Sequence, residues 1–144
     1  MKLENIIAEW SKDSKIDPFN LGNEAISIPT LHHKYYQIYL AEKAQYFAYE
    51  SDYKKLKLLK YEFYTQGPTK PQHENWQLPA IGKILRNDVQ MYMESDDDLI
   101  AAELKIKYQK EKIEFVDSII KSLTNRGFQI KSAIEYERFK MGSL

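Results

Sequence analysis

Lysine, tyrosine and leucine side chains are interleaved over residues 53–64, which read YKKLKLLKYEFY. On a helix, six of these side chains fall within a sector of about 120°: Tyr53, Lys54, Lys57, Lys60, Tyr61 and Tyr64. A row of lysines can contact phosphates, and tyrosine rings can stack on unpaired bases of any sequence. The pattern therefore predicts an interface for a single-stranded nucleic acid at Lys54, Lys57, Lys60, Tyr61 and Tyr64. The alternative is a helix–helix interface with buried tyrosines and lysine stems along its rim.

The opposite side of the same helix is apolar. Leu56, Leu59 and Phe63 face away from the lysines and can anchor the helix to a core. Tyr39 and Tyr46 extend the aromatic row toward the N-terminus at heptad spacing. Three lysines on phosphates give a salt slope of only about −2 at roughly 0.7 per contact, so one chain alone would bind weakly.

Helices must position these side chains, since no segment alternates polar and apolar residues as a strand does. A first helix is predicted over residues 2–11 from the spacing of Leu3, Ile6, Ile7 and Trp10. Asp17 is expected to cap a second helix, with Pro18 at its first position. Pro29 is expected to interrupt that helix, and a long helix is predicted over residues 30–64.

The second half of the chain begins with a loop and continues as helix. Residues 65–82 contain three prolines and two glycines, which predicts an extended connection. Ser95 or one of the aspartates after it is expected to cap a helix that lasts to about Asn125. The sequence NRG at 125–127 predicts a bend or stop, and residues 128–140 form a short terminal helix. The predicted fold class is all-α.

Apolar residues recur at heptad spacing in the second long helix, with Gln109 as one polar member. This seam consists of Leu99, Ala102, Ile106, Gln109, Ile113, Val116, Ile120 and Leu123. Such a seam fits either the core of one chain or self-association, and a polar residue at one position commonly specifies the oligomer. We expect oligomerisation through residues 94–144, at Ile106, Ile113, Val116, Ile120 and Leu123. Residues 1–93 would then form the DNA-binding region, whose repetition around a ring could raise avidity by ~10²–10⁴.

The composition bounds the class of protein. The 144 residues include 21 lysines and arginines and 21 aspartates and glutamates. The net charge is therefore zero and by itself does not indicate nucleic-acid binding. There is no cysteine, which excludes disulfides and thiolate ligands. The first residues lack the apolar core of a secretory signal, and no stretch approaches the roughly 20 apolar residues of a membrane span. We expect a soluble protein that does not associate with membranes.

Motifs for catalysis are not apparent. The chain has neither a GxxxxGK[ST] phosphate loop nor a GxGxxG turn. His32 and His33 are adjacent, so on a helix they diverge by about 100° and make a poor metal pair. The run SDDD at 95–98 lacks the glycine and terminal glutamate of a calcium loop. We expect no enzymatic activity, no metal and no cofactor.

Several short motifs, in this order and spacing, resemble the UvsY-like recombination mediators of tailed bacteriophages. They are Ile16, Asp17, Leu21, Glu24 and Ala25, then LHHKY at 31–35, LKYEFYTQG at 59–67, the heptad helix, RGFQIK at 126–131 and FKMG at 139–142. The segment LKYEFYTQG is similar to the family's basic, DNA-contacting segment, K-x-[RK]-x-[DE]-[YF]-Y. Carried over, Lys60 is the second basic position, Glu62 the acid, and Phe63 and Tyr64 the aromatic pair. The first basic position falls on Leu58, and Lys57 is the nearest substitute.

The resemblance implies an all-α protein that forms rings of six or seven copies through its C-terminal helices and binds single-stranded DNA. It also implies two protein partners, a phage RecA-like recombinase and a phage single-strand-binding protein, in the cytoplasm of the bacterial host. Such proteins weaken the hold of the single-strand-binding protein and help to load the recombinase. The main alternative is a helical virion or scaffold protein whose lysine–tyrosine face packs on other helices. A small nuclease subunit is a weaker alternative, since no cluster of metal ligands is apparent.

Overall fold

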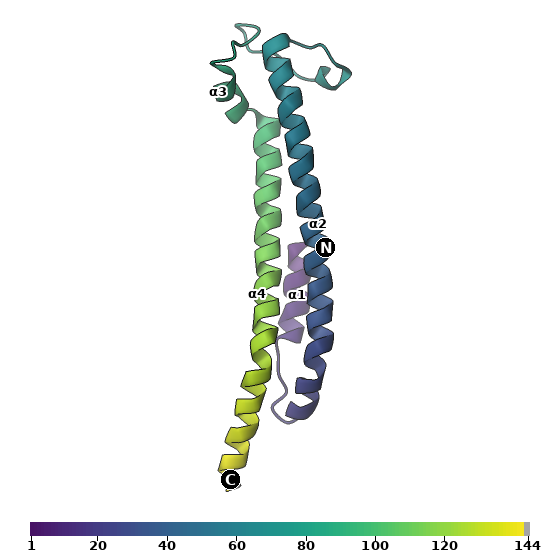
Figure 1. The fold of residues 1–144 in the computed structure, drawn as a ribbon, viewed down its shortest axis with the longest axis vertical. Coiled ribbons are helices and arrows are strands. Elements are labelled where there is room, and N and C mark those ends of the chain that lie inside the picture. The colour runs from purple at the N-terminus through teal and green to yellow at the C-terminus, as the bar shows by residue number, and fades with distance from the viewer. Residues whose placement is uncertain (143–144) are drawn as a thin grey trace. The chain divides into compact units, whose positions relative to one another are not determined.

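The computed structural model describes residues 1–142, and its regular elements are helices. Helix α1 spans Leu3–Asp13, α2 spans Leu21–Gln66, and a short 3-10 helix, η1, spans Pro71–His73 (Figure 1). Helix α3 spans Val89–Glu94 and α4 spans Asp97–Lys140. No strand occurs within residues 1–142. The predicted all-α class and the predicted first helix are confirmed.

The chain divides into two compact units. Unit 1 consists of residues 1–44 and 111–144, and unit 2 consists of residues 45–110. Helices α2 and α4 each contribute one part to each unit. The sequence analysis divided the chain between residues 93 and 94 instead, and those two regions remain a prediction about function. The last two residues of the second region, 143–144, lie outside the described residues.

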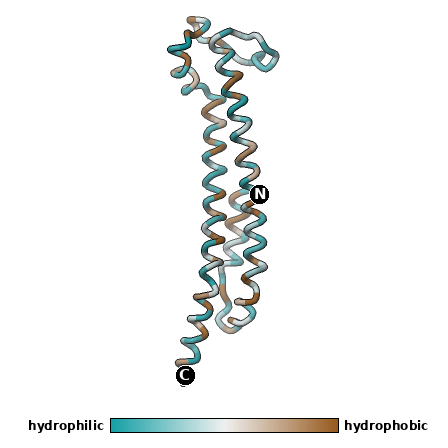
Figure 2. Tube along the Cα trace, in the orientation of Figure 1, coloured by the Kyte–Doolittle hydropathy of each residue, from teal (hydrophilic) through white to brown (hydrophobic). Residues whose placement is uncertain are grey.

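Three helices share the core of unit 1. Its buried side chains are Ile6 of α1, Tyr35 of α2, and Val116, Ile119 and Leu123 of α4. Figure 1 shows α1 lying beside α2 and α4 in this unit. Figure 2 shows hydrophobic and hydrophilic segments alternating along α2 and α4, as expected for helices that each bury one face.

Polar contacts hold the end of α1 in unit 1. The Arg126 Nη2 donates a hydrogen bond to the backbone carbonyl oxygen of Asp13 over 2.7 Å. Lys34 Nζ lies 2.7 Å from a carboxylate oxygen of Glu9 and 2.7 Å from one of Asp13. Burial by itself raises the pKa of Asp13, but hydrogen bonds from Lys34 and Tyr35 outweigh it and hold that pKa below its usual value.

The predicted start and interruption of the second helix are wrong. Helix α2 begins at Leu21, and Asp17 instead accepts a hydrogen bond from the Phe19 N–H in a turn before it. The helix then runs through Pro29 without a break. A proline inside a helix costs about 3 kcal/mol. The packing of Leu31 and Tyr35 against the other helices of unit 1 offsets that cost.

The predicted stop at residues 125–127 is also wrong, because α4 is continuous from Asp97 to Lys140. A glycine inside a helix costs only about 1 kcal/mol relative to alanine. On either side of Gly127, buried Leu123 and Ile130 anchor the helix, and buried Arg126 donates a hydrogen bond to Asp13, the last residue of α1. Tertiary contacts therefore carry the helix through a sequence that favours a bend.

Unit 2 is built from residues 45–66 of α2, residues 97–110 of α4, and the connection between them. Its buried core contains Phe63, Tyr64, Ile84, Val89, Met93 and Leu99. Gly67 ends α2 with φ +86°, a left-handed conformation that favours glycine, and its N–H donates to the Phe63 carbonyl. The proline-rich connection is confirmed, and His73 of η1 and Trp76 just after it pack against Phe63. Helix α3 was not predicted.

Candidate nucleic-acid interface

Lys60, near the end of α2, is buried in unit 2. Its ammonium nitrogen lies 2.8 Å from Asp98 Oδ2 and 3.1 Å from Asp96 Oδ2. It also lies over the ring of Trp76, 3.8 Å from the centroid. The Tyr64 hydroxyl donates a hydrogen bond to Asp96 Oδ2 over 2.6 Å. We call these five side chains, Lys60, Tyr64, Trp76, Asp96 and Asp98, the lysine node.

Asp96 links the lysine node to the start of α4. Its Oδ1 accepts a hydrogen bond from the Leu99 N–H over 3.0 Å, so an aspartate caps this helix as predicted. Burial by itself raises the pKa of Asp96, but hydrogen bonds from Tyr64, Leu99 and Lys60 outweigh it and hold that pKa below its usual value. Burial, together with the bond to Asp96, raises the pKa of Tyr64 above its usual range. The node therefore combines two aspartate side chains with a protonated phenol and an ammonium group.

Acid is expected to destabilise unit 2 through Asp96. The folded-state pKa is lower than the ordinary value of 3.8, so this carboxylate stabilises the fold fully above that value. The stabilisation is lost as the pH falls below about 4 toward the folded-state pKa. Urea unfolding between about pH 6 and pH 3 should show a steeper loss of stability for the natural chain than for Asp96→Asn, which cannot ionise. Equal pH dependence of the two proteins would contradict the role of Asp96.

The expectation that Lys60 and Tyr64 lie on an exposed face is wrong. Only 4% of Lys60 is exposed, and Tyr64 belongs to the buried core. The helical projection grouped the side chains by angle, but it could not show that the start of α4 covers this turn of α2. Phe63 is buried as predicted. The acid of the family-like segment, Glu62, forms an ion pair with Lys70.

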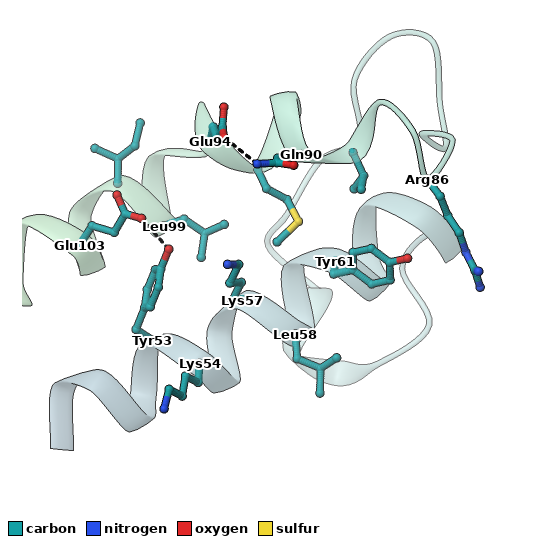
Figure 3. Close-up of a pocket in the computed structure, with 13 residues that line it drawn as sticks. Tyr53, Lys54, Lys57, Leu58, Tyr61, Arg86, Gln90, Glu94, Leu99 and Glu103 are labelled. Carbon is teal, nitrogen blue, oxygen red and sulfur yellow. Dashed lines mark hydrogen bonds between the residues drawn. The ribbon is translucent and has the colours of Figure 1, made fainter. Parts of the chain in front are cut away.

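The other predicted DNA-binding residues, Lys54, Lys57 and Tyr61, line a groove of about 730 Å³ in unit 2. Figure 3 shows these three side chains on α2, with Gln90 and Glu94 on α3 and Glu103 on α4. The groove thus brings together three of the five predicted residues. The other two lie beneath the surface in the lysine node.

The cations of the groove are available to an anion. Lys54, Lys57 and Arg86 line it and are exposed. None of the three forms an ion pair with any of residues 1–142. An exposed ammonium or guanidinium group without a carboxylate partner can contact a phosphate without breaking an existing bond.

The two carboxylates of the groove are each bound by a neutral donor. The Tyr53 hydroxyl donates to Glu103 Oε1 over 2.6 Å, and Gln90 Nε2 donates to Glu94 Oε1 over 3.0 Å (Figure 3). The bond to Glu103 raises the pKa of Tyr53 to about 12, so the phenol stays a donor at neutral pH. Three cations face two carboxylates, and the groove has a small positive excess.

Several residues of the groove were not found from the sequence. Arg86 lies in the connection, where its spacing from α2 gives no sign that the two meet. The apolar wall consists of Val89, Met93 and Leu99, which also belong to the core of unit 2. Leu58 lines the groove as well. Its place at the first basic position of the family-like motif was the one available signal.

The predicted oligomerisation residues lie mostly inside the chain. Ile113, Val116 and Leu123 are buried in unit 1, and Ile120 is half-buried there. Ile106 is half-buried in unit 2. The expectation that this seam is exposed for another copy is therefore wrong for Ile113, Val116 and Leu123, which are buried within the chain, and α1 and α2 contribute to the core that holds Val116 and Leu123. The seam's polar member, Gln109, is also buried.

Two further features were sought in the described part of the chain. Among residues 1–142, no group of three or more histidine, aspartate or glutamate side chains is placed to hold a metal ion. No helix within the same range has the length and apolar character required to cross a membrane.

Comparison with known proteins identifies the class. Residues 9–143 match a sequence model described as recombination, repair and ssDNA binding protein UvsY. The chain is thus a helical protein of recombination and repair, of a class that binds single-stranded DNA. It belongs to the UvsY family. A search of curated protein sequences finds no match.

Solved structures share this fold. The fold is similar to crystal structures of the recombination mediator protein UvsY of bacteriophage T4. One of them superposes with a TM-score of 0.78 at 20% sequence identity, over 97% of this chain and 99% of that chain. Another gives 0.79 at 20% identity, over 98% of each. At this identity the similarity establishes the fold.

Proposed function

We propose that this protein is a recombination mediator that binds single-stranded DNA through Lys54, Lys57 and Tyr61. The observation that carries the proposal is the groove, where cations without carboxylate partners lie beside an aromatic ring. Lysines there would neutralise phosphates, and the ring would stack on a base. A duplex keeps its bases stacked on one another, so this combination favours a single strand.

Binding through one groove would be weak, so the proposal includes self-association. Two lysines per chain supply a salt slope of only about −1.4. A ring of six or seven copies would hold neighbouring grooves on one strand, and each later contact would become intramolecular. Such a ring would protect the strand while it passes from one protein to the next.

Helix α4 offers an exposed surface for self-association in place of the buried seam. Phe128, Tyr136 and Phe139 are all exposed, and at 100° per residue they share a sector of about 80°. Buried Ile130 lies on the opposite side of the helix. We call these three side chains the terminal apolar face. Exposed aromatic groups in one sector are typical of surfaces that another protein covers.

In the proposed role the protein acts in the bacterial host, where it weakens the hold of the phage single-strand-binding protein on DNA. It then helps to load a RecA-like recombinase as a filament on the same strand. Binding rather than catalysis performs this work, since the exchange needs only a protein that holds DNA while one partner leaves and another assembles. A helical virion or scaffold protein is the competing proposal, and DNA binding separates the two.

The double substitution Lys54→Ala with Lys57→Ala should flatten the salt dependence of single-strand binding. Each lost phosphate contact removes about 0.7 from the slope, so the change is about 1.4 per groove engaged. Both side chains are exposed and unpaired, so the thermal unfolding midpoint should stay the same. Fluorescence anisotropy with a labelled oligonucleotide at several salt concentrations measures the slope.

Lys55→Ala is the matched control for this experiment. Lys55 is an exposed lysine on the same turn of α2, but it does not line the groove. Its loss should change the slope less than Lys57→Ala alone. An unchanged slope and affinity in the double variant would contradict the proposed DNA-binding role and favour the virion or scaffold alternative.

A further inference from the structure

The groove in unit 2 has an apolar part that the phosphate contacts do not use. Its floor is formed by Val89, Met93 and Leu99, which are buried in the core and therefore fixed in position. Leu58 and Ile100 stand at its rim and are exposed. Leu58 has 58% of its surface exposed, next in sequence to the unpaired Lys57. An exposed leucine beside free cations gives neither core packing nor phosphate binding in the unbound chain.

We infer that this apolar part is a subsite for one unpaired nucleobase, which contacts the floor and the rim side chains Leu58 and Ile100. The inference rests on the proposed function, since it assigns the place of a base within the DNA-binding groove. The volume of the whole groove, about 730 Å³, lies in the range of roughly 300–1,000 Å³ that is typical of small-ligand sites. The groove therefore has room for a base and its sugar.

Charge complementarity argues for a nucleotide over an apolar protein side chain. Lys57 and Arg86 line the same groove as the apolar floor and have no carboxylate partner among residues 1–142. In a nucleotide, the flat apolar face of the base and the anionic phosphate are a few bonds apart. One such ligand can therefore contact both the apolar floor and the cations of the groove. The two carboxylates, Glu94 and Glu103, already accept hydrogen bonds from Gln90 and Tyr53.

The subsite would also explain why leucine is compatible with a DNA-binding role at residue 58. A lysine there would add a phosphate contact, but it would remove the apolar rim on which a base can lie. Apolar contact with a base face does not depend on its hydrogen-bonding groups, so this site would accept all four bases. The inferred ligand is thus any unpaired base of a single strand.

An abasic oligonucleotide tests the inference. It keeps the phosphates and sugars of the natural strand but has no bases. The natural chain should bind a thymidine oligonucleotide at least about fivefold more tightly than an abasic strand of the same length, the lower end expected for one stacked base. The double substitution Leu58→Ser with Ile100→Ser should lower this ratio to the part that stacking on Tyr61 supplies, and it should leave the salt slope unchanged because no charge is altered.

Leu104→Ser is the matched control. Leu104 is 59% exposed on α4 in the same unit, but it does not line the groove. It should keep both the ratio and the slope. Equal ratios in the natural chain and the Leu58/Ile100 variant would overturn the base subsite, while a salt-dependent affinity for both strands would leave the proposed function standing.

A different outcome would overturn both proposals. If neither strand binds at low salt, the groove has no nucleic-acid ligand. Circular dichroism tests whether the Leu58/Ile100 variant is still folded. Both residues are exposed, so helicity and the unfolding midpoint should match those of Leu104→Ser.

Discussion

Lys60→Ala should lower the free energy of unfolding by about 3 kcal/mol, since it removes the cation of a buried pair and leaves a carboxylate behind. Asp96 would keep its hydrogen bonds from Tyr64 and Leu99, but its charge would lose the ammonium group 3.1 Å away. The contact with the Trp76 ring would be lost as well. Urea unfolding followed by circular dichroism at neutral pH measures the change.

Lys57→Ala supplies the comparison, because it removes a lysine three residues away that is exposed and unpaired. Its effect on stability should stay within about 0.5 kcal/mol. A double-mutant cycle with Asp96→Asn isolates the pair, and the expected coupling between residues 60 and 96 is about 1–3 kcal/mol. If Lys60→Ala proves as stable as Lys57→Ala while flattening the salt slope, Lys60 contacts DNA and the node has been misassigned.

The second large effect concerns the heptad seam. Ile113→Asp with Ile120→Asp should unfold unit 1, with a loss of at least about 4 kcal/mol, because Ile113 is buried and Ile120 packs against the apolar core, so both carboxylates would lose water without gaining a partner. If the seam instead joined separate copies, as the sequence analysis expected, the same double variant would disperse an oligomer and keep its helices. Far-ultraviolet circular dichroism and thermal unfolding distinguish the two results.

Phe128→Asp with Tyr136→Asp places the same two charges on the terminal apolar face of the same helix. Both side chains are exposed in the single chain, so helicity should be kept. If this face mediates self-association, light scattering should show a smaller particle. Two results together would contradict this. If the Phe128/Tyr136 variant keeps its mass and the Ile113/Ile120 variant becomes a folded monomer, the heptad seam mediates self-association, as the sequence suggested.

The sequence predicted the helices better than it predicted their partners. Helical periodicity correctly marked the first helix, the apolar anchor Phe63 and the aspartate cap of α4. It could not show that α4 begins beside Lys60, because that contact joins residues 38 apart along the chain. Pro29 and Gly127 were interpreted as breaks from local propensity, and tertiary packing overrides both. The heptad pattern correctly marked a buried seam, but periodicity does not tell whether the partner is the same chain or another copy.

The candidate site was likewise predicted only in part. Lys54, Lys57 and Tyr61 were found from residue type and spacing, and these properties are local. Arg86, Val89 and Met93 enter the groove because the proline-rich connection returns the chain to α2, and no pattern in the sequence encodes that return. Leu58 was noted only as a departure from a motif. Its exposure beside an apolar floor is a property of the folded unit.

The arrangement of unit 1 sets an order on folding during synthesis. Unit 2 is one continuous stretch, residues 45–110, whereas unit 1 joins residues 1–44 to residues 111–144. The bond from Arg126 to Asp13 spans 113 residues. Helix α1 and the first part of α2 therefore leave the ribosome with their apolar faces uncovered, and they stay so until the second part of α4 emerges. Because the contacts of unit 2 lie within one continuous stretch of chain, this unit can fold while residues 1–44 still lack their partner segment. The nascent chain can thus carry the folded groove of unit 2 before it has the segment that completes the core of unit 1.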